Sequence, residues 1–275
     1  MRLPAYVVPL LALATAVVSL LSLRVAGAPN GIIAIQAGAF VLAALIAAPG
    51  RAASLINAFD ARWTMATLLL LAAAVLFAGV EIDGARRWLR IGPVLLHPAS
   101  LFGGFLLLAL ARAPGSAPCA ALAGATVLCF GLGNDGAASL AFALGLSGLL
   151  LGERRHWKTL LPLCVLAWCL AAWGWSRPDS LVPVPYVEEI VARTWAAARS
   201  LGAAAAILLA LLPLPFLLTA HAAGKRGARY ALAGFWAGLV LAGLFGNYPI
   251  PVIGYGASPV IGWVLALRLL SSRSP

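Results

Sequence analysis

The sequence predicts an all-α integral membrane protein with about ten transmembrane helices, arranged as a single polytopic domain over residues 1–275. Hydrophobic residues make up 63% of the chain, charged residues 10%, and the mean hydropathy is +1.00. A soluble domain carries about 25% charged residues. The apolar runs are also continuous, which is typical of membrane helices, whereas the strands of a membrane barrel alternate between apolar and polar residues.

Ten apolar segments are close to the length that crosses roughly 30 Å of hydrocarbon, although several are short. We expect spans near residues 4–23, 31–49, 63–80, 99–113, 117–132, 137–152, 159–175, 200–219, 228–246 and 258–271. The first segment follows Arg2 as a signal peptide would, but its apolar run is too long for one, and we interpret it as a span. The two segments around Asn134 and Asp135 are alternatively one long kinked helix.

The basic residues indicate the orientation of the chain. The formal net charge is +11, but the basic residues are scattered between apolar runs and form no stripe that could bind nucleic acid. With the N-terminus inside, 12 of the 19 Lys and Arg fall on the inner face and 7 on the outer face. Cytoplasmic loops are rich in Lys and Arg, so both termini are expected in the cytoplasm. The inner cluster 153–158 is interpreted as a contact with anionic membrane lipids.

The cysteines and histidines give no sign of a metal site. The four cysteines lie inside apolar runs without C-x-x-C spacing, and we interpret them as small buried hydrophobic residues. The three histidines are far apart in the sequence. No metal ligand is therefore assigned, and the cofactor stays open, with a divalent cation as one alternative.

Four stretches on the predicted outer side carry polar residues that membrane topology does not explain. Charges close to lipid are costly, so such clusters indicate a function. They cover residues 81–98, 133–136, 176–200 and 247–259. Three of them carry recognisable motifs. Residues 83–93 read Asp-Gly-Ala-Arg-Arg-Trp-Leu-Arg-Ile-Gly-Pro and are followed by His97-Pro98, residues 134–136 read Asn-Asp-Gly, and residues 249–258 read Pro-Ile-Pro-Val-Ile-Gly-Tyr-Gly-Ala-Ser.

These motifs resemble those of the SEDS family, the FtsW, RodA and SpoVE proteins. The family shows N-G-A-x-R-W-(I/L)-x-L-G and then Q-P-(S/A)-E after its third span, Q-P-D-L-G between its fifth and sixth spans, and L-P-(F/L)-(V/I)-S-Y-G-G-S-S before its last span. All three motifs occur here in the same order and between the corresponding segments. The resemblance implies a SEDS-like helix bundle in the bacterial cytoplasmic membrane.

The resemblance also implies an activity. SEDS proteins polymerise lipid II, a polyprenyl-pyrophosphate-linked disaccharide, into glycan strands on the outer face of the membrane, in cell division or shape control. They usually work beside a class B penicillin-binding protein. The implied partners are therefore lipid II or a similar lipid-linked sugar, and such a protein.

The sequence departs from the family at two places. The outer loop after the seventh segment is short, although Pro183 precedes Glu188 by the spacing that separates proline from the catalytic aspartate in the family. The glutamate and lysine of the family's Q-P-S-E-L-x-K are replaced by Ser100 and Gly103. Losing both charges together avoids an unpaired buried charge, so the fold can survive the change.

Seven residues are candidates for the site. Glu188 is the candidate general base, or alternatively a carboxylate that stabilises the start of the following helix. The guanidinium groups of Arg86, Arg87 and Arg90 could grip a pyrophosphate, or could anchor their loop and pair with nearby carboxylates. Three more residues could contact the substrate, but helix capping for the first and turn packing for the others explain them as well: Asp135, Tyr255 and Ser258.

Two further functions stay open. The first is a catalytically silent SEDS-like protein that binds lipid carriers or partner membrane proteins. The second is a transporter, which is weaker because the sequence shows no membrane-embedded acidic relay beyond Asp135.

Overall fold

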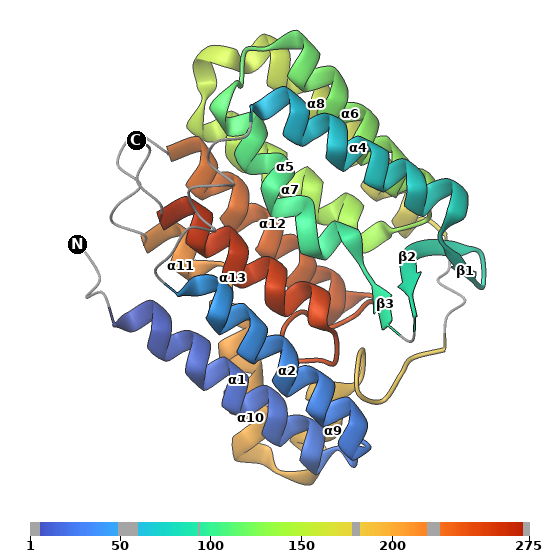
Figure 1. The fold of residues 1–275 in the computed structure, drawn as a ribbon, viewed down its shortest axis with the longest axis vertical. Coiled ribbons are helices and arrows are strands. Elements are labelled where there is room, and N and C mark those ends of the chain that lie inside the picture. Colours follow the sequence, from blue (N-terminus) through green and yellow to red (C-terminus); the bar gives the residue numbers. More distant parts are fainter. Residues whose placement is uncertain (1–5, 49–59, 93, 178–181, 219–225, 272–275) are drawn as a thin grey trace.

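The computed structural model describes residues 6–48, 60–92, 94–177, 182–218 and 226–271, and these form a helix bundle with a small sheet at one end (Figure 1). Among the residues that the structure describes, five helices are long and apolar enough to cross a membrane: α1 (Val7–Val25), α2 (Asn30–Ala47), α4 (Ala61–Ala78), α8 (Trp157–Trp175, extended by the short helix Arg154–His156) and α12 (Arg226–Phe245). Five shorter apolar helices complete the set: α5 (Pro98–Arg112), α6 (Ala117–Leu132), α7 (Gly136–Gly152), α10 (Arg199–Leu211) and α13 (Ala257–Ser271).

These ten helices correspond one to one with the ten apolar segments of the sequence, which confirms the predicted fold class. The alternative of one kinked helix around Asn134 is wrong, because α6 and α7 are separate helices. Asn134 has a φ of +58°, and this left-handed conformation ends the helical path. The short helix α9 (Ile190–Ala197) is not predicted by the apolar pattern, and the segment expected at 200–219 is divided between α10 and a second short helix, α11 (Leu214–Leu218).

The polar stretch after α4, which the sequence predicts to be an outer loop, is a three-stranded antiparallel sheet. Its strands are β1 (Val80–Ile82), β2 (Ala85–Ile91) and β3 (Val94–Leu96), with β2 in the centre. Asp83 and Gly84 form the turn between β1 and β2, with φ values of +47° and +80°. An Asp-Gly pair is the preferred turn of a tight hairpin, so a signal for this sheet is present in the sequence.

Close packing between α7 and α12 forms the centre of the bundle, and glycines make it close. A methyl group added at Gly238 would lie 2.5 Å from the Cα atom of Ala141, and one added at Gly234 would meet the backbone of Leu144. Small residues let two membrane helices approach until their backbones touch, which gains dispersion energy where no hydrophobic effect operates.

An aromatic cluster fills the core between these helices and α5. Phe142 lies 5.8 Å from Phe130 and 5.2 Å from Phe235, measured between ring centroids. Gly103 of α5, which stands where the SEDS motif has lysine, faces the same ring: a methyl group there would come within 2.6 Å of Phe235 Cε2. An aromatic ring therefore occupies the space into which a longer side chain at this position would extend.

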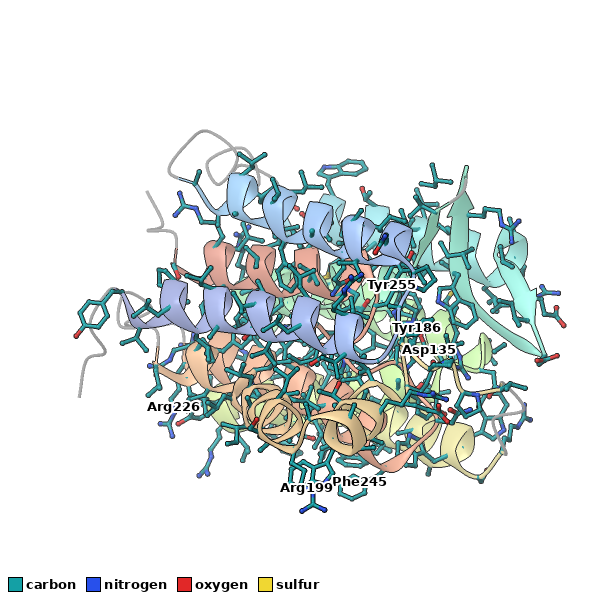
Figure 2. All side chains as sticks on the ribbon, turned by 90° about the horizontal axis from the view of Figure 1, so that it is seen from below. Asp135, Tyr186, Arg199, Arg226, Phe245 and Tyr255 are labelled. Atoms are coloured by element: carbon teal, nitrogen blue, oxygen red, sulfur yellow. The ribbon has the colours of Figure 1, made fainter. Side chains whose placement is uncertain are left out.

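The polar stretches predicted to lie outside gather at one end of the bundle. Figure 2 shows Asp135, Tyr186 and Tyr255 at the end that carries the sheet, whereas Arg226 lies at the opposite end. In Figure 1, α12 and α13 run between the α1–α2 pair and the group α4 to α8. The three-stranded sheet lies at one end of the bundle. The fold thus brings residues far apart in the sequence to one end.

The contact between α7 and α12 can be tested with a single methyl group. Gly238→Ala forces a methyl group against the backbone of Ala141, and overpacking of this kind costs about 1–3 kcal/mol. We expect a lower melting temperature in detergent. Gly38→Ala in α2 is the control, because no atom lies within 4 Å of its added methyl group. Equal melting temperatures for the two variants would contradict the proposed tightness of the contact.

Candidate functional site

A buried network of polar side chains lies at the sheet end of the bundle. His97 precedes α5, Asp135 precedes α7, Arg87 lies on β2, and Ser258 lies in the first turn of α13. Arg87, Asp135 and Ser258 are each at most 3% exposed. Four elements from three regions of the sequence therefore meet at this point.

His97 and Asp135 join the starts of two helices. The Nε2 atom of His97 lies 2.9 Å from Oδ2 of Asp135. The other oxygen of Asp135 accepts a hydrogen bond from the backbone N–H of Ala138 at 3.0 Å, and Nδ1 of His97 accepts one from the N–H of Ser100 at 3.3 Å. Each side chain thus caps a helix. The Nε2 atom of His97 therefore connects the cap of α5 to the cap of α7.

The surroundings of Asp135 keep it charged. Burial by itself raises the pKa of this carboxyl, but the charge and hydrogen bond of His97, the guanidinium of Arg87 and the N–H of Ala138 together lower it below its usual range. A carboxylate that is almost fully buried is tolerated here because several donors and positive charges surround it. The capping role that the sequence allowed for Asp135 is therefore present, and it is combined with an electrostatic one.

The three candidate arginines occupy different environments. Arg87 is buried, and its Nε donates to the carbonyl of Asn134 at 3.0 Å. Its guanidinium carbon lies 5.0 Å from the ring centroid of Tyr248. Arg86, on the other face of β2, pairs with Glu81 at 2.6 Å, as the structural interpretation of the sequence expected, and Arg90 is exposed. The structure therefore brings Arg87 to Asp135 and separates it from the other two.

The last of the sequence motifs reaches the network through α13. The hydroxyl oxygen of Ser258 accepts a hydrogen bond from the backbone N–H of His97 at 2.9 Å. Tyr255, three residues earlier, is half-buried, and its backbone N–H donates to the carbonyl of Tyr186 at 2.8 Å. Ser258 is therefore part of the network, and Tyr255 links the same loop to the segment that carries Glu188.

Glu188 lies in a short turn before α9. Its Oε2 atom accepts a hydrogen bond from the backbone N–H of Val184 at 2.8 Å, and its side chain is half-buried. The neighbouring carbonyl of Val187 accepts from the N–H of Ile250 at 3.2 Å. Glu189 instead pairs with Arg193 one turn further along α9. The structure places Glu188 beside the 249–256 loop, and its role as a base stays a prediction.

Several residues of the site have no role predicted from the sequence. The motifs identify His97 only as a position within them, and they give no signal for Tyr248. Gln36 and Ser19 bind the loop that carries Tyr255, and both are fully buried. Gln36 is the one glutamine in the sequence and lies within an apolar segment, which is the signal that could have identified it. In the part of the chain that the structure describes, no three His, Cys, Asp or Glu side chains gather to hold a metal ion.

Comparisons with known proteins show similarity over part of the sequence and over most of the fold. No family model matches the sequence. The probable peptidoglycan glycosyltransferase FtsW of Nitrosococcus halophilus is 33% identical over 122 residues, which cover 40% of this chain. The match covers 32% of that relative, so the chain spans about a third of its length.

Solved structures match over more of the chain. The rod shape determining protein RodA of Thermus thermophilus has a TM-score of 0.69 at 24% identity, covering 96% of this chain and 94% of that chain. A chain from a structure of a peptidoglycan synthase complex, described as coordinating polymerization and crosslinking, has a TM-score of 0.63 at 22% identity. This match covers 95% of the present chain and 96% of the other.

The apolar helices and the structural matches define a multi-pass membrane protein whose fold is similar to that of RodA, in agreement with the resemblance seen in the sequence motifs. The chain is similar to FtsW over 122 residues of its sequence and to RodA across nearly its whole fold.

The charge on Asp135 should make stability depend on pH. Because its pKa is lower in the folded protein than in the unfolded chain, the stabilisation is present above the ordinary pKa of about 3.9 and is lost as the pH falls through the folded value. Asp135→Asn keeps a capping oxygen but has no charge to lose. We expect the melting-temperature gap between wild type and this variant to shrink from pH 7 to pH 3.5.

Asp60→Asn serves as the control, because Asp60 also caps a helix, by accepting from the N–H of Arg62, but is exposed. A gap for Asp135→Asn that is constant with pH, or that changes no more than the gap for Asp60→Asn, would show that the Asp135 charge does not stabilise the fold.

Proposed function

We propose that this protein is a SEDS-type glycosyltransferase that polymerises lipid II, or a similar polyprenyl-pyrophosphate-linked sugar, into glycan strands for cell-wall synthesis in cell division or shape control. The observation that carries the proposal is the SEDS fold over 96% of the chain, with the motif residues Arg87, Asp135 and Ser258 gathered in one network at one end. The names of the relatives, a peptidoglycan glycosyltransferase and a rod shape determining protein, support it.

The proposed reaction transfers a glycan from its pyrophosphate carrier to the hydroxyl of a second lipid-linked sugar. Glu188 takes the proton of the acceptor hydroxyl, and the oxygen attacks the anomeric carbon of the donor. A glycosidic C–O bond forms, the bond from that carbon to the pyrophosphate oxygen breaks, and the carrier pyrophosphate leaves with the electron pair. No oxidant or further reactant is required.

The network supports the binding of the leaving group. The starts of α5 and α7, which have partial positive charge, meet at the His97–Asp135 contact, and Arg87 adds a full positive charge next to them. Asp135 neutralises part of this charge and holds Arg87 and His97 in place. We propose that the positive charge that remains favours a pyrophosphate as negative charge builds on it.

The general base can be tested with two neighbouring variants. Glu188→Gln keeps an oxygen that can accept from Val184 N–H, so the turn is preserved while the basic carboxylate is lost. We expect it to lose polymerisation of purified lipid II by at least about 100-fold, within the range for general-base catalysis. Glu189→Gln, which removes the ion pair with Arg193, is the matched control and should stay active. Products are separated by length on gels.

A second function is favoured by one observation: the Glu188 carboxylate already serves a structural purpose by binding Val184 N–H. A catalytically silent SEDS-like protein that binds lipid carriers or partner membrane proteins would retain this kind of structural contact. Wild type that binds lipid II without forming polymer would support the silent protein, and full activity of Glu188→Gln would remove Glu188 as the base while leaving the polymerase in place.

We also propose the partner and the membrane. A class B penicillin-binding protein is the proposed partner, supported by the matching chain from a peptidoglycan synthase complex. The proposed location is the bacterial cytoplasmic membrane with both termini in the cytoplasm, so that the sheet end, and with it Glu188, faces the lipid-linked sugar on the outer side.

The orientation can be measured by cysteine labelling. All four native cysteines are free, two of them buried, and they are first replaced. A cysteine is then introduced by Asp83→Cys at the hairpin turn, or by Arg155→Cys at the other end, where the arginine side chain is 80% exposed. In intact cells a membrane-impermeant maleimide should label the Asp83→Cys variant. It should label the Arg155→Cys variant only after the cells are lysed. The reverse pattern would place the termini outside.

A further inference from the structure

The loop between α12 and α13 holds a strained turn deep in the protein. The N–H of Ile253 donates to the carbonyl of Pro251 at 2.7 Å, and Val252 between them has a φ of +65°. A three-residue turn with positive φ at its centre is rare and strained, and a β-branched residue makes it more so. Such a turn persists only where its surroundings force it. Val252 and Ile253 are fully buried, so these surroundings are other parts of the protein.

One side chain, Gln36 of α2, makes three hydrogen bonds to the turn and to the residues directly after it. Its Nε2 lies 3.1 Å from the carbonyl oxygens of both Val252 and Gly254, and its Oε1 accepts a hydrogen bond from the N–H of Gly256 at 3.0 Å. The amide group uses both its donor and its acceptor on the main chain of the loop. Gln36 is itself fully buried, so water does not compete for these groups.

Ser19 of α1 completes the contact from the neighbouring helix. Its hydroxyl donates to the carbonyl of Ile253 at 2.9 Å, and its oxygen lies 3.2 Å from Nε2 of Gln36. The carbonyl oxygens of three consecutive residues, 252 to 254, are therefore all held by side chains of the α1–α2 pair. These side chains supply the partners that a non-helical backbone needs when it is buried in a membrane protein.

The opposite side of the loop contacts the segment of the candidate base. The N–H of Tyr255 donates to Tyr186, and a methyl group at Gly254 would lie 2.7 Å from the carbonyl oxygen of Val187, directly before Glu188. The hydroxyl of Tyr186 donates to the carbonyl of Gly27, in the connection between α1 and α2. The α1–α2 pair, the loop and the Glu188 segment thus touch one another in a closed ring of contacts.

We propose that Gln36 is a positioning residue. Its buried amide fixes the 251–256 loop, and the loop in turn fixes the position of the Glu188 segment relative to Ser258. The inference rests on the proposed function, since it assigns Gln36 a part in the same site. Ser19 assists it. The α1–α2 pair carries no motif residue of the site, but in this proposal its side chains position residues of the site.

The test replaces Gln36 with an apolar residue of similar size. Gln36→Leu keeps the volume and removes every hydrogen bond to the loop, and Ser19→Ala is the milder second variant if the first does not fold. We expect lipid II polymerisation by Gln36→Leu to fall about 100-fold in kcat with little change in KM, because a displacement of about 1 Å at a catalytic group has this effect.

Two controls separate positioning from stability. Trp263→Phe removes a buried hydrogen bond to the carbonyl of Leu212, at 3.0 Å, away from the loop, and lowers stability without touching the site. Thr15→Ala removes a buried hydroxyl of α1 that bonds within its own helix, to Leu11. Both should keep their kcat when assayed below their melting temperatures. A loss for Trp263→Phe equal to that for Gln36→Leu, at the same fall in melting temperature, would overturn the proposal.

Amide hydrogen exchange provides a readout that does not depend on activity. Gln36→Leu should raise exchange at Gly254, Tyr255 and Gly256 and in the Glu188 segment, whereas Trp263→Phe should not. If wild type makes no polymer, the proposed function fails, and the exchange pattern then decides the positioning role by itself. Unchanged exchange in both segments would refute that role, whether or not the protein is an enzyme.

Discussion

The site depends on one constraint: backbone that leaves the helical path inside a membrane protein must find hydrogen-bond partners within the protein. The chain breaks its helices at residues 133–135 and 246–256, and both breaks are largely buried. At the first, Gly133 accepts from the N–H of Arg86, and Asn134 accepts from the side chain of Arg87. At the second, Gln36 and Ser19 provide the partners. The residues that satisfy these breaks are the ones that surround the site.

The chain lacks the charged pair of the family motif, and other contacts occupy both positions. Where the motif has glutamate, Ser100 donates its N–H to His97, and where it has lysine, Gly103 leaves room for the ring of Phe235. One position keeps a polar contact at the helix start, and the other becomes part of an aromatic core. The buried charges that remain near the start of α5 are those of Asp135 and Arg87, which match positions that are also charged in the family motifs.

Composition predicted the helices, and the motifs pointed to three of the residues that the structure brings together, Arg87, Asp135 and Ser258, whereas contacts that depend on tertiary packing were not predictable. The ten helices arise from apolar runs, since lipid imposes the same requirement on each of them. The gathering of Arg87, Asp135 and Ser258 arises from three motifs that the fold places at one end of the bundle. Sequence alone could not separate Arg87 from Arg86, because strand register decides which arginine points inward, and the sheet was not expected. Gln36 belongs to no motif, and its contacts join residues more than 200 positions apart.

The loop before Glu188 is short, but hydrogen bonds to other parts of the chain fix the position of the segment that carries Glu188. Tyr186 accepts from the N–H of Tyr255 and donates its hydroxyl to Gly27, and Val187 accepts from the N–H of Ile250. These contacts come from two different parts of the chain, so the segment is fixed in more than one direction. A carboxylate held in this way loses little further freedom when substrate binds, which is the condition for an effective base. A short loop is therefore compatible with a fixed position of Glu188, the residue proposed as the base.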